Sequence, residues 1–289
     1  MRILVATDGA PNARRAADWL TEFPLPADAE IRVVSVATLP PSPIDIPPVR
    51  EFYRAALGFA ETAAKEACAQ LSHRWPKSES RVLEGEPREA IVGEAEAWPA
   101  DLIVLGARGL STIQGFLLGS VSTGVVQHAH CSVLVVKGRL HAFREAVIAI
   151  DGSPGSLAAA RFVASLPLEG KPAITLLGVA ERADIPMVAD EVMAYRLPEA
   201  IAQATEQRKA ELESVLARVG GDFAGRARDV ESSVVVGHPA EVIVRAAAES
   251  DIDLVVVGAR GLGRFTRLLL GSVSERVLHH ATCPVLVVK

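Results

Sequence analysis

Two glycine-rich stretches carry the residue types that could bind a phosphate group. The first runs from Gly106 to Lys137 (GARGLSTIQGFLLGSVSTGVVQHAHCSVLVVK) and the second from Gly258 to Lys289 (GARGLGRFTRLLLGSVSERVLHHATCPVLVVK). Aligned without a gap, they agree at 20 of 32 positions, at a constant offset of 152 residues. A repeat at a fixed offset indicates two copies of one structural unit.

In each copy an apolar run, DLIVLG or DLVVVG, precedes the glycines, and a helical pattern follows Gly-Ser. This predicts a loop between the carboxyl end of a buried parallel strand and the amino end of a helix. Ligands of open α/β sheets bind at that edge, where free N–H groups and the helix dipole attract phosphate. Glycines can also serve turn geometry alone, but the identical spacing in both copies favours a phosphate loop.

An aspartate ends the first predicted strand of each half, Asp8 in RILVATD and Asp151 in EAVIAID. A carboxylate at a strand end can accept hydrogen bonds from two vicinal hydroxyls, which would select a ribose. The alternative is that each aspartate begins a turn and caps the next helix. The chain contains neither GxxxxGK[ST] nor GxGxxG, so a P-loop ATPase or a dinucleotide-binding fold has no direct support.

The length and composition predict two domains, 1–140 and 141–289, joined by a linker at 138–143. Hydrophobic residues make up 49% of the chain and aromatic residues 4%, a mixture that suits parallel strands covered by helices. The net charge of −5 argues against a nucleic-acid partner, and we expect no membrane span. The three cysteines form no CxxC pair, and the N-terminus reads as a strand, so we expect a reduced, cytoplasmic location.

Strands and helices are expected to alternate, which is typical of parallel βαβ units. The expected strands are 2–8, 31–37, 80–84, 101–106 and 132–137, then 145–151, 173–180, 230–236 and the two apolar runs of the second glycine stretch. The first expected helix ends near Glu22. The others span 50–73, 87–97, 119–129, 156–166 and 239–249, together with a continuous helix over 190–219 in which Pro198 is an interruption. The proline-rich segment TLPPSPIDIPPVR is expected to be a loop.

Both halves resemble the universal stress protein family, whose ATP-binding members carry the glycine spacing Gly-x2-Gly-x9-Gly-Ser/Thr and an aspartate after the first strand. The resemblance covers the whole chain. It implies two tandem open-sheet α/β domains, each a five-stranded parallel sheet of order 3-2-1-4-5 with helices on both faces. It also implies that ATP, an adenine nucleotide, lies across the carboxyl ends of strands 1 and 4. Whether Mg²⁺ accompanies the ATP stays open.

The resemblance also assigns roles to individual residues. In the first half they are Ala6, Asp8, Val36, Leu105, Gly106, Gly109, Gly119, Ser120 and Val121. In the second half they are Ala149, Asp151, Val179, Val257, Gly258, Gly261, Arg264, Gly271, Ser272 and Val273. The aspartates take the ribose hydroxyls, the backbone of the two strand-2 valines reads the adenine edge, and the glycine loops hold phosphate. One departure is Ala10, which stands where the second half has Ser153.

The loops before Gly-Ser also differ, because the second half has Arg260, Arg264 and Arg267 and the first has only Arg108. Arginine can fork onto phosphate oxygens, so the second half is expected to bind ATP more tightly. The alternative is that these arginines form a solvated basic face.

The last strands, SVLVV and PVLVV, are apolar edge strands that need covering. We expect the two halves to pair through them as an internal pseudo-dimer, and a further homodimer stays open. No catalytic residue and no metal site are predicted, because the histidines near the helix ends lack ligand spacing.

The leading function is therefore an ATP-binding, regulatory stress-response protein without fast catalysis. The alternatives are a slow ATP hydrolase or adenylate-type enzyme, and a structural pseudo-dimer with non-functional pockets.

Overall fold

The structure is a computed structural model. It describes residues 1–38, 46–107, 118–138, 140–168, 170–181, 191–249, 252–261 and 270–289, with the side chains of 191–197 left out.

The two halves have the same order of elements. The first half contains β1 (Arg2–Ala6), α1 (Pro11–Glu22), β2 (Glu30–Ala37), α2 (Pro47–Ser72), β3 (Glu79–Glu84), α3 (Pro87–Ala97), β4 (Leu102–Gly106), α4 (Ser120–His128) and β5 (Ser132–Val136). The second half contains β6 (Glu145–Ile150), α5 (Pro154–Ser165), β7 (Ala173–Ala180), α6 (Glu191–Gly220), the short 3₁₀ turn η1 (Gly221–Phe223), β8 (Val230–Val236), α7 (Pro239–Ala247), β9 (Leu254–Gly258), α8 (Ser272–His280) and β10 (Val285–Val288).

The described strands form one sheet of order β3-β2-β1-β4-β5-β10-β9-β6-β7-β8. Each half contributes five parallel strands in the predicted order 3-2-1-4-5, so the predicted fold class is confirmed. In each half the direction of winding changes beside the first strand, between β1 and β4 and between β6 and β9. A doubly wound sheet opens a crevice at such a switch point, on the carboxyl side of the strands.

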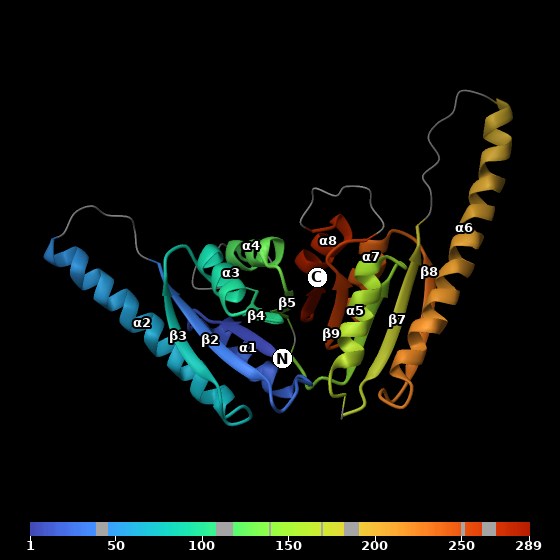
Figure 1. The fold of residues 1–289 in the computed structure, drawn as a ribbon. Helices are drawn as coiled ribbons and strands as arrows, with labels where there is room; N and C mark the ends of the chain where they lie inside the picture. The colour runs from blue at the N-terminus through green and yellow to red at the C-terminus, as the bar shows by residue number, and fades with distance from the viewer. Residues whose placement is uncertain are drawn as a thin grey trace.

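Alternate residues of the strands bury opposite faces of the sheet, as the pleat requires. On one face Ile3 and Val5 pack with residues of α1, α2, α5 and α6, in a core that continues into the second half. On the other face Leu4 belongs to a core formed with α3, α4, α7 and α8. Figure 1 shows α2 and α6 along the two outer flanks, with β5 and both chain ends near the middle.

The two halves meet where β5 pairs with β10, and this pairing is antiparallel. Leu134 stands opposite Leu286, and both side chains are fully buried. The expected pairing of the two last strands is therefore confirmed. Because both hydrophobic cores run across this junction, the paired strands join the halves through side-chain packing as well as through backbone hydrogen bonds.

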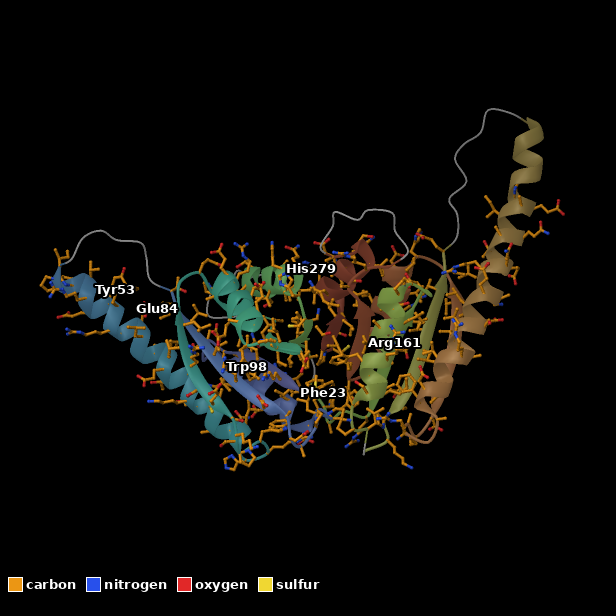
Figure 2. All side chains as sticks on the ribbon, in the orientation of Figure 1. Phe23, Tyr53, Glu84, Trp98, Arg161 and His279 are labelled. Carbon is orange, nitrogen blue, oxygen red and sulfur yellow. The ribbon has the colours of Figure 1, made fainter. Side chains whose placement is uncertain are left out.

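The linker between the halves is held against α1. Trp19 donates from its indole N–H to the carbonyl of His141 at 2.8 Å, and Arg15 donates to the carbonyl of Gly138 at 2.9 Å. Phe23 packs edge-on against Phe143, with ring centroids 5.4 Å apart, and Figure 2 places Phe23 beside the junction. These contacts limit the freedom of one half relative to the other.

Three expectations for the elements were wrong. β1 ends at Ala6, so Asp8 follows the strand by two residues instead of ending it. The helix α2 begins at Pro47, inside the proline-rich segment that was expected to be loop. Proline is favoured at the first helical position because the N–H that it lacks would be unpaired there. The helix expected over 190–219 is continuous, as predicted, but the expected interruption at Pro198 is absent, since α6 runs through it.

The cysteines and the helices also bear on where the protein could reside. Cys68, Cys131 and Cys283 are unpaired thiols. Burial raises the pKa of Cys131 and of Cys283 to about 11, so both remain protonated and unreactive near neutrality. Over the described residues, no helix is both long and apolar enough to cross a bilayer.

A lysine from each half reaches across the junction to the end of the other half's last helix. Lys137 Nζ donates to the carbonyl of Leu278 in α8, and Lys289 Nζ donates to the carbonyl of Gln127 in α4 at 3.4 Å. Carbonyls at a helix C-terminus lack intrahelical partners and carry partial negative charge. Burial lowers the pKa of Lys137 from 10.5 to about 8.

This lysine should make stability depend on pH. The folded pKa lies below the unfolded one, so between about pH 8 and 10.5 the unfolded chain holds a proton that the folded chain has lost. Stability from this site therefore rises across that window, and the burial cost is fully present below it. The unfolding free energy of the native chain minus that of Lys137→Met should rise by up to about 3 kcal/mol between pH 8 and 10.5. Urea denaturation of both proteins measures it, and a flat difference would contradict the burial of a charged amine.

Candidate functional site

A tight turn follows β6 and places the Asp151 carboxylate at the sheet edge. Gly152 has a φ of +81°, a conformation that residues other than glycine rarely adopt. The Asp151 Oδ1 atom accepts from the backbone N–H of Ser153 at 2.9 Å, which closes the turn. The turn role considered for this aspartate is therefore real, and it occupies one carboxylate oxygen.

The other carboxylate oxygen faces the glycine loop after β9. A Cβ atom on Gly261 would lie 2.6 Å from Asp151 Oδ2, so a larger residue there would push the carboxylate aside. Gly258 fits equally closely against the start of α5, because a Cβ there would lie 2.5 Å from the carbonyl carbon of Gly155. The two glycines thus let the β9 loop, Asp151 and the N-terminus of α5 meet.

The N-terminus of α8 completes the edge. Gly271 is its N-cap residue and has no side chain with which to cap the helix. The backbone N–H of Gly271 donates to the carbonyl of Ala259 at 2.8 Å, and Ser274 Oγ donates to the carbonyl of Gly258 at 2.6 Å, so loop and helix are fastened together. Backbone N–H groups in the first turn of a helix lack intrahelical acceptors and attract anions.

These pieces surround a cavity of about 500 Å³ in the second half. Its volume lies within the range of about 300–1,000 Å³ that is usual for small-molecule sites. Nine of the predicted residues line it: Ala149, Asp151, Val179, Val257, Gly258, Gly261, Gly271, Ser272 and Val273. Arg264 lies outside the described residues.

The first half repeats the backbone arrangement. Ala6 of β1 pairs with Leu105 of β4, and the N–H of Gly119 donates to the carbonyl of Ala107 at 2.7 Å, as its counterpart does in the second half. Asp8 Oδ1 accepts from the N–H of Ala10 at 3.0 Å and closes the same turn. The remaining predicted residues stand at strand 2, strand 4 and the start of α4: Val36, Gly106, Ser120 and Val121. Gly109 lies outside the described residues.

Five charged or polar residues of the cavity wall were not among the predicted site residues, and one of them, Ser274, belongs to α8. Ser156 comes from α5, Arg260 from the glycine loop, and Glu181 follows β7 directly. Arg208 comes from α6 and donates from Nη2 to the backbone carbonyl of Asp151 at 2.6 Å. The arginine content of the loop did draw attention to Arg260, and Ser274 belongs to the repeated Gly-Ser-Val-Ser segment, but no repeated motif marks Ser156, Glu181 or Arg208.

The hydroxyl that Ala10 lacks has a structural role in the second half. Ser153 is the N-cap of α5, where its Oγ accepts from the N–H of Ser156 at 3.2 Å and donates to the carbonyl of Arg260 at 3.4 Å. It is 1% exposed and does not line the cavity. Ala10 is the corresponding N-cap of α1 and caps nothing with its side chain.

Exchanging the two cap residues should therefore move stability in opposite directions. Ser153→Ala should lower the unfolding free energy by about 1 kcal/mol, and Ala10→Ser should raise it by a similar amount, because a hydroxyl at the N-cap satisfies a helix N–H. Denaturant titration of the two variants checks both signs. A stability gain from Ser153→Ala, or a loss from Ala10→Ser, would contradict the cap assignment.

The histidines do not gather into a metal site among the described residues. His128 ends α4, and His279 and His280 lie in the last turn of α8, positions that suit a histidine near the negative end of a helix. His130 lies beyond α4, and its Nδ1 contacts Glu96 Oε1 at 2.7 Å on the surface.

Fold and cleft together define a duplicated, doubly wound α/β protein with a ligand-sized cavity at a switch point of the sheet. The chain belongs to the universal stress protein family, whose sequence profile matches residues 1–137 and 142–289. A universal stress protein of Mycobacterium tuberculosis is 31% identical over 307 residues, which covers 99% of this chain and 96% of that protein.

Two further comparisons fit the duplication. A universal stress protein of Thermus aquaticus is 36% identical over 135 residues, covering 47% of this chain and 97% of its own length, so it corresponds to one half. The crystal structure of a universal stress protein from Archaeoglobus fulgidus superposes with a TM-score of 0.68 at 22% identity, covering 100% of this chain and 96% of that one. At that identity the likeness concerns the fold.

Proposed function

We propose that the cavity of the second half binds an adenine nucleotide, with ATP as the leading candidate. One observation carries the proposal: Asp151, the close-approach glycines Gly258 and Gly261, and the uncapped N-terminus of α8 line a single cavity. A carboxylate suits ribose hydroxyls, and a helix N-terminus behind a glycine loop suits phosphate. A cavity of about 500 Å³ is far larger than a free phosphate ion needs and has room for a nucleotide.

In this proposal the adenine base binds against the apolar side chains of the cavity wall. Ala149 and Val179 line the cavity from β6 and β7, and Ile243 lines it from α7. A flat base can rest between these side chains, while the backbone of Val179 supplies hydrogen bonds to its edge. In the same proposal Gly271 and Ser272 hold the phosphates, and Arg264 adds a cation from the same loop.

We propose the corresponding site in the first half at Asp8, Gly106, Gly109 and Gly119, with residues 1–140 and 141–289 as the two domains. The chain then acts as a cytoplasmic, ATP-responsive regulator in stress response, in which nucleotide occupancy rather than turnover carries the signal. ATP supplies the signal by being bound, and Asp151 and the α8 N-terminus orient it.

The test is calorimetric titration of the purified chain with ATP, AMP, adenosine and GTP, with and without Mg²⁺. Saturable binding of ATP, tighter than binding of GTP, is the expected result. Absence of binding by a chain that circular dichroism shows to be folded would sink the proposal. Release of phosphate measured in the same samples tests the enzyme alternative, and fast turnover would favour it.

A further inference from the structure

The wall of the second-half cavity includes a positively charged side chain that comes from a helix and not from either glycine loop. Arg208 of α6 lines the cavity, and its Nη2 donates to the backbone carbonyl of Asp151 at 2.6 Å. The Arg208 side chain is 33% exposed, so it sits at the rim rather than on the open surface. Among the described residues its second polar contact is Glu211 Oε2, 3.3 Å from Nη1. A guanidinium has five N–H donors, which leaves donors for a ligand.

Packing fixes where this arginine stands. One turn further along α6, Leu212 is fully buried, and so is Leu216 on the same face of the helix. Val215 lies against the turn after β6, 3.8 Å from the position that a Cβ of Gly152 would take. A helix anchored in this way carries Arg208 to the Asp151 turn as a fixed group rather than as a mobile surface chain.

Arg208 and the glycine loop approach different atoms of Asp151. The carboxylate of Asp151 is directed at Gly261 of the glycine loop, whereas its backbone carbonyl is directed at Arg208. A nucleotide with its phosphates on the glycine loop and its ribose hydroxyls on the carboxylate would therefore turn its ribose edge toward the guanidinium. In dinucleotide-binding folds an arginine near the ribose accommodates a phosphate on the 2′ oxygen.

The first half has no charge at the corresponding position. The turn glycine Gly9 faces Ala63 of α2, as Gly152 faces Val215 of α6, so these two helix positions correspond. Seven residues earlier, α2 has Ala56 where α6 has Arg208. This difference in charge between the two clefts is separate from the difference in arginine content between the two glycine loops.

We propose that Arg208 is a specificity-determining residue that lets the second cleft bind adenine nucleotides carrying a phosphate on the ribose 2′ or 3′ oxygen, which the first cleft does not favour. The inference rests on nucleotide binding at this cleft and names the ligand class more narrowly. The guanidinium forks onto the ribose phosphate, and Asp151 accepts from the remaining hydroxyl. Glu211, whose Oε2 lies 3.3 Å from Nη1 of the arginine, partly neutralises the guanidinium when no such phosphate is bound.

The experiment uses the full chain with the first cleft blocked by Gly119→Val. Titration calorimetry compares AMP with adenosine 2′,5′-bisphosphate and adenosine 3′,5′-bisphosphate. We expect at least one bisphosphate to bind more tightly than AMP. Arg208→Ala should weaken the preferred bisphosphate by roughly 10-fold or more and AMP by only about 2-fold, because a partly exposed charge contact contributes modestly to ligands that do not use it. Arg218→Ala, an exposed arginine in the last turn of the same helix, is the matched control and should change neither.

The outcomes separate the two proposals. No binding of ATP, of AMP or of either bisphosphate would defeat nucleotide binding itself, whereas binding of ATP alone would overturn only the role of Arg208. AMP binding without preference for a bisphosphate would overturn only the role of Arg208. Equal weakening of all three ligands by Arg208→Ala would overturn it too, because the arginine would then act only by holding the Asp151 turn. In the reciprocal protein, with Gly271→Val and an open first cleft, Ala56→Arg should raise bisphosphate affinity relative to AMP.

Discussion

Replacing Gly271 with valine should remove nucleotide binding from the second cleft and leave the fold intact. A Cβ at this position would lie 3.4 Å from the carbonyl oxygen of Ala259 and 3.7 Å from Cα of Arg260, which are ordinary contacts. The N-cap φ of −75° is open to any residue. The valine methyl groups, however, would fill the space before the α8 N-terminus, where the phosphate is proposed to sit. We expect ATP affinity at this cleft to fall by about 100-fold or more, and stability by about 1 kcal/mol at the cap.

Substitutions at two other glycines serve as controls for Gly271→Val. Gly258→Ala should destabilise the whole chain by several kcal/mol, because its Cβ would collide with the backbone of α5 and force the helix away. Gly221→Val should do little, since among the described residues no atom outside its immediate neighbours lies within 4 Å of its Cβ position. Calorimetry in the Gly119→Val background measures binding, and urea titration measures stability. Unchanged ATP affinity in Gly271→Val would contradict the phosphate seat.

The order of strands and the pairing of the halves could be predicted because the information is local or repeated. Buried parallel strands show as apolar runs, and the duplicated glycine stretch shows which runs correspond. The start of α2 at Pro47 was missed because proline both ends helices and begins them, and composition alone does not distinguish the two cases. The end of β1 was misplaced for a related reason: strand residues and turn residues differ little in pattern over Val5 to Asp8.

The residues of the candidate site also fall into a group that the sequence predicts and a group that it does not. The nine predicted residues that line the cavity belong to strand ends and to the repeated loop, whose positions follow from the topology of the sheet. Arg208 follows Asp151 by 57 residues and belongs to a helix whose register is set by Leu212 and Leu216 packing on the sheet. Nothing in the local sequence indicates which of the many charged residues of α6 meets the cleft. The expected difference between the loop arginines falls on Arg108, Arg264 and Arg267, which lie outside the described residues.

Residues 1–140 produced alone should form a dimer through β5. Its five residues are buried in the full chain, and the antiparallel partner of Val133, Leu134 and Val135 is β10. Separation would expose this edge and the apolar side chains on both of its faces, a strong driving force for strand pairing. The register favours self-pairing, because Leu134 faces Leu286, its own equivalent at the repeat offset of 152. A second β5 can therefore take the place of β10 with Leu134 opposite Leu134.

The expected result is a dimer in analytical ultracentrifugation at micromolar concentration, and association of the 1–140 fragment with separately produced 141–289 when the two are mixed. Ser132→Lys with Leu134→Lys should weaken the dimer, because charges on an edge strand oppose pairing and would be buried unpaired in the new interface. The matched control is Arg54→Lys, on the exposed surface of α2 away from β5, which should leave the dimer unchanged. A folded fragment that stays monomeric across the concentration range would show that the β5–β10 contact is held by the linker at Trp19 and Phe23 rather than by the affinity of the strands themselves.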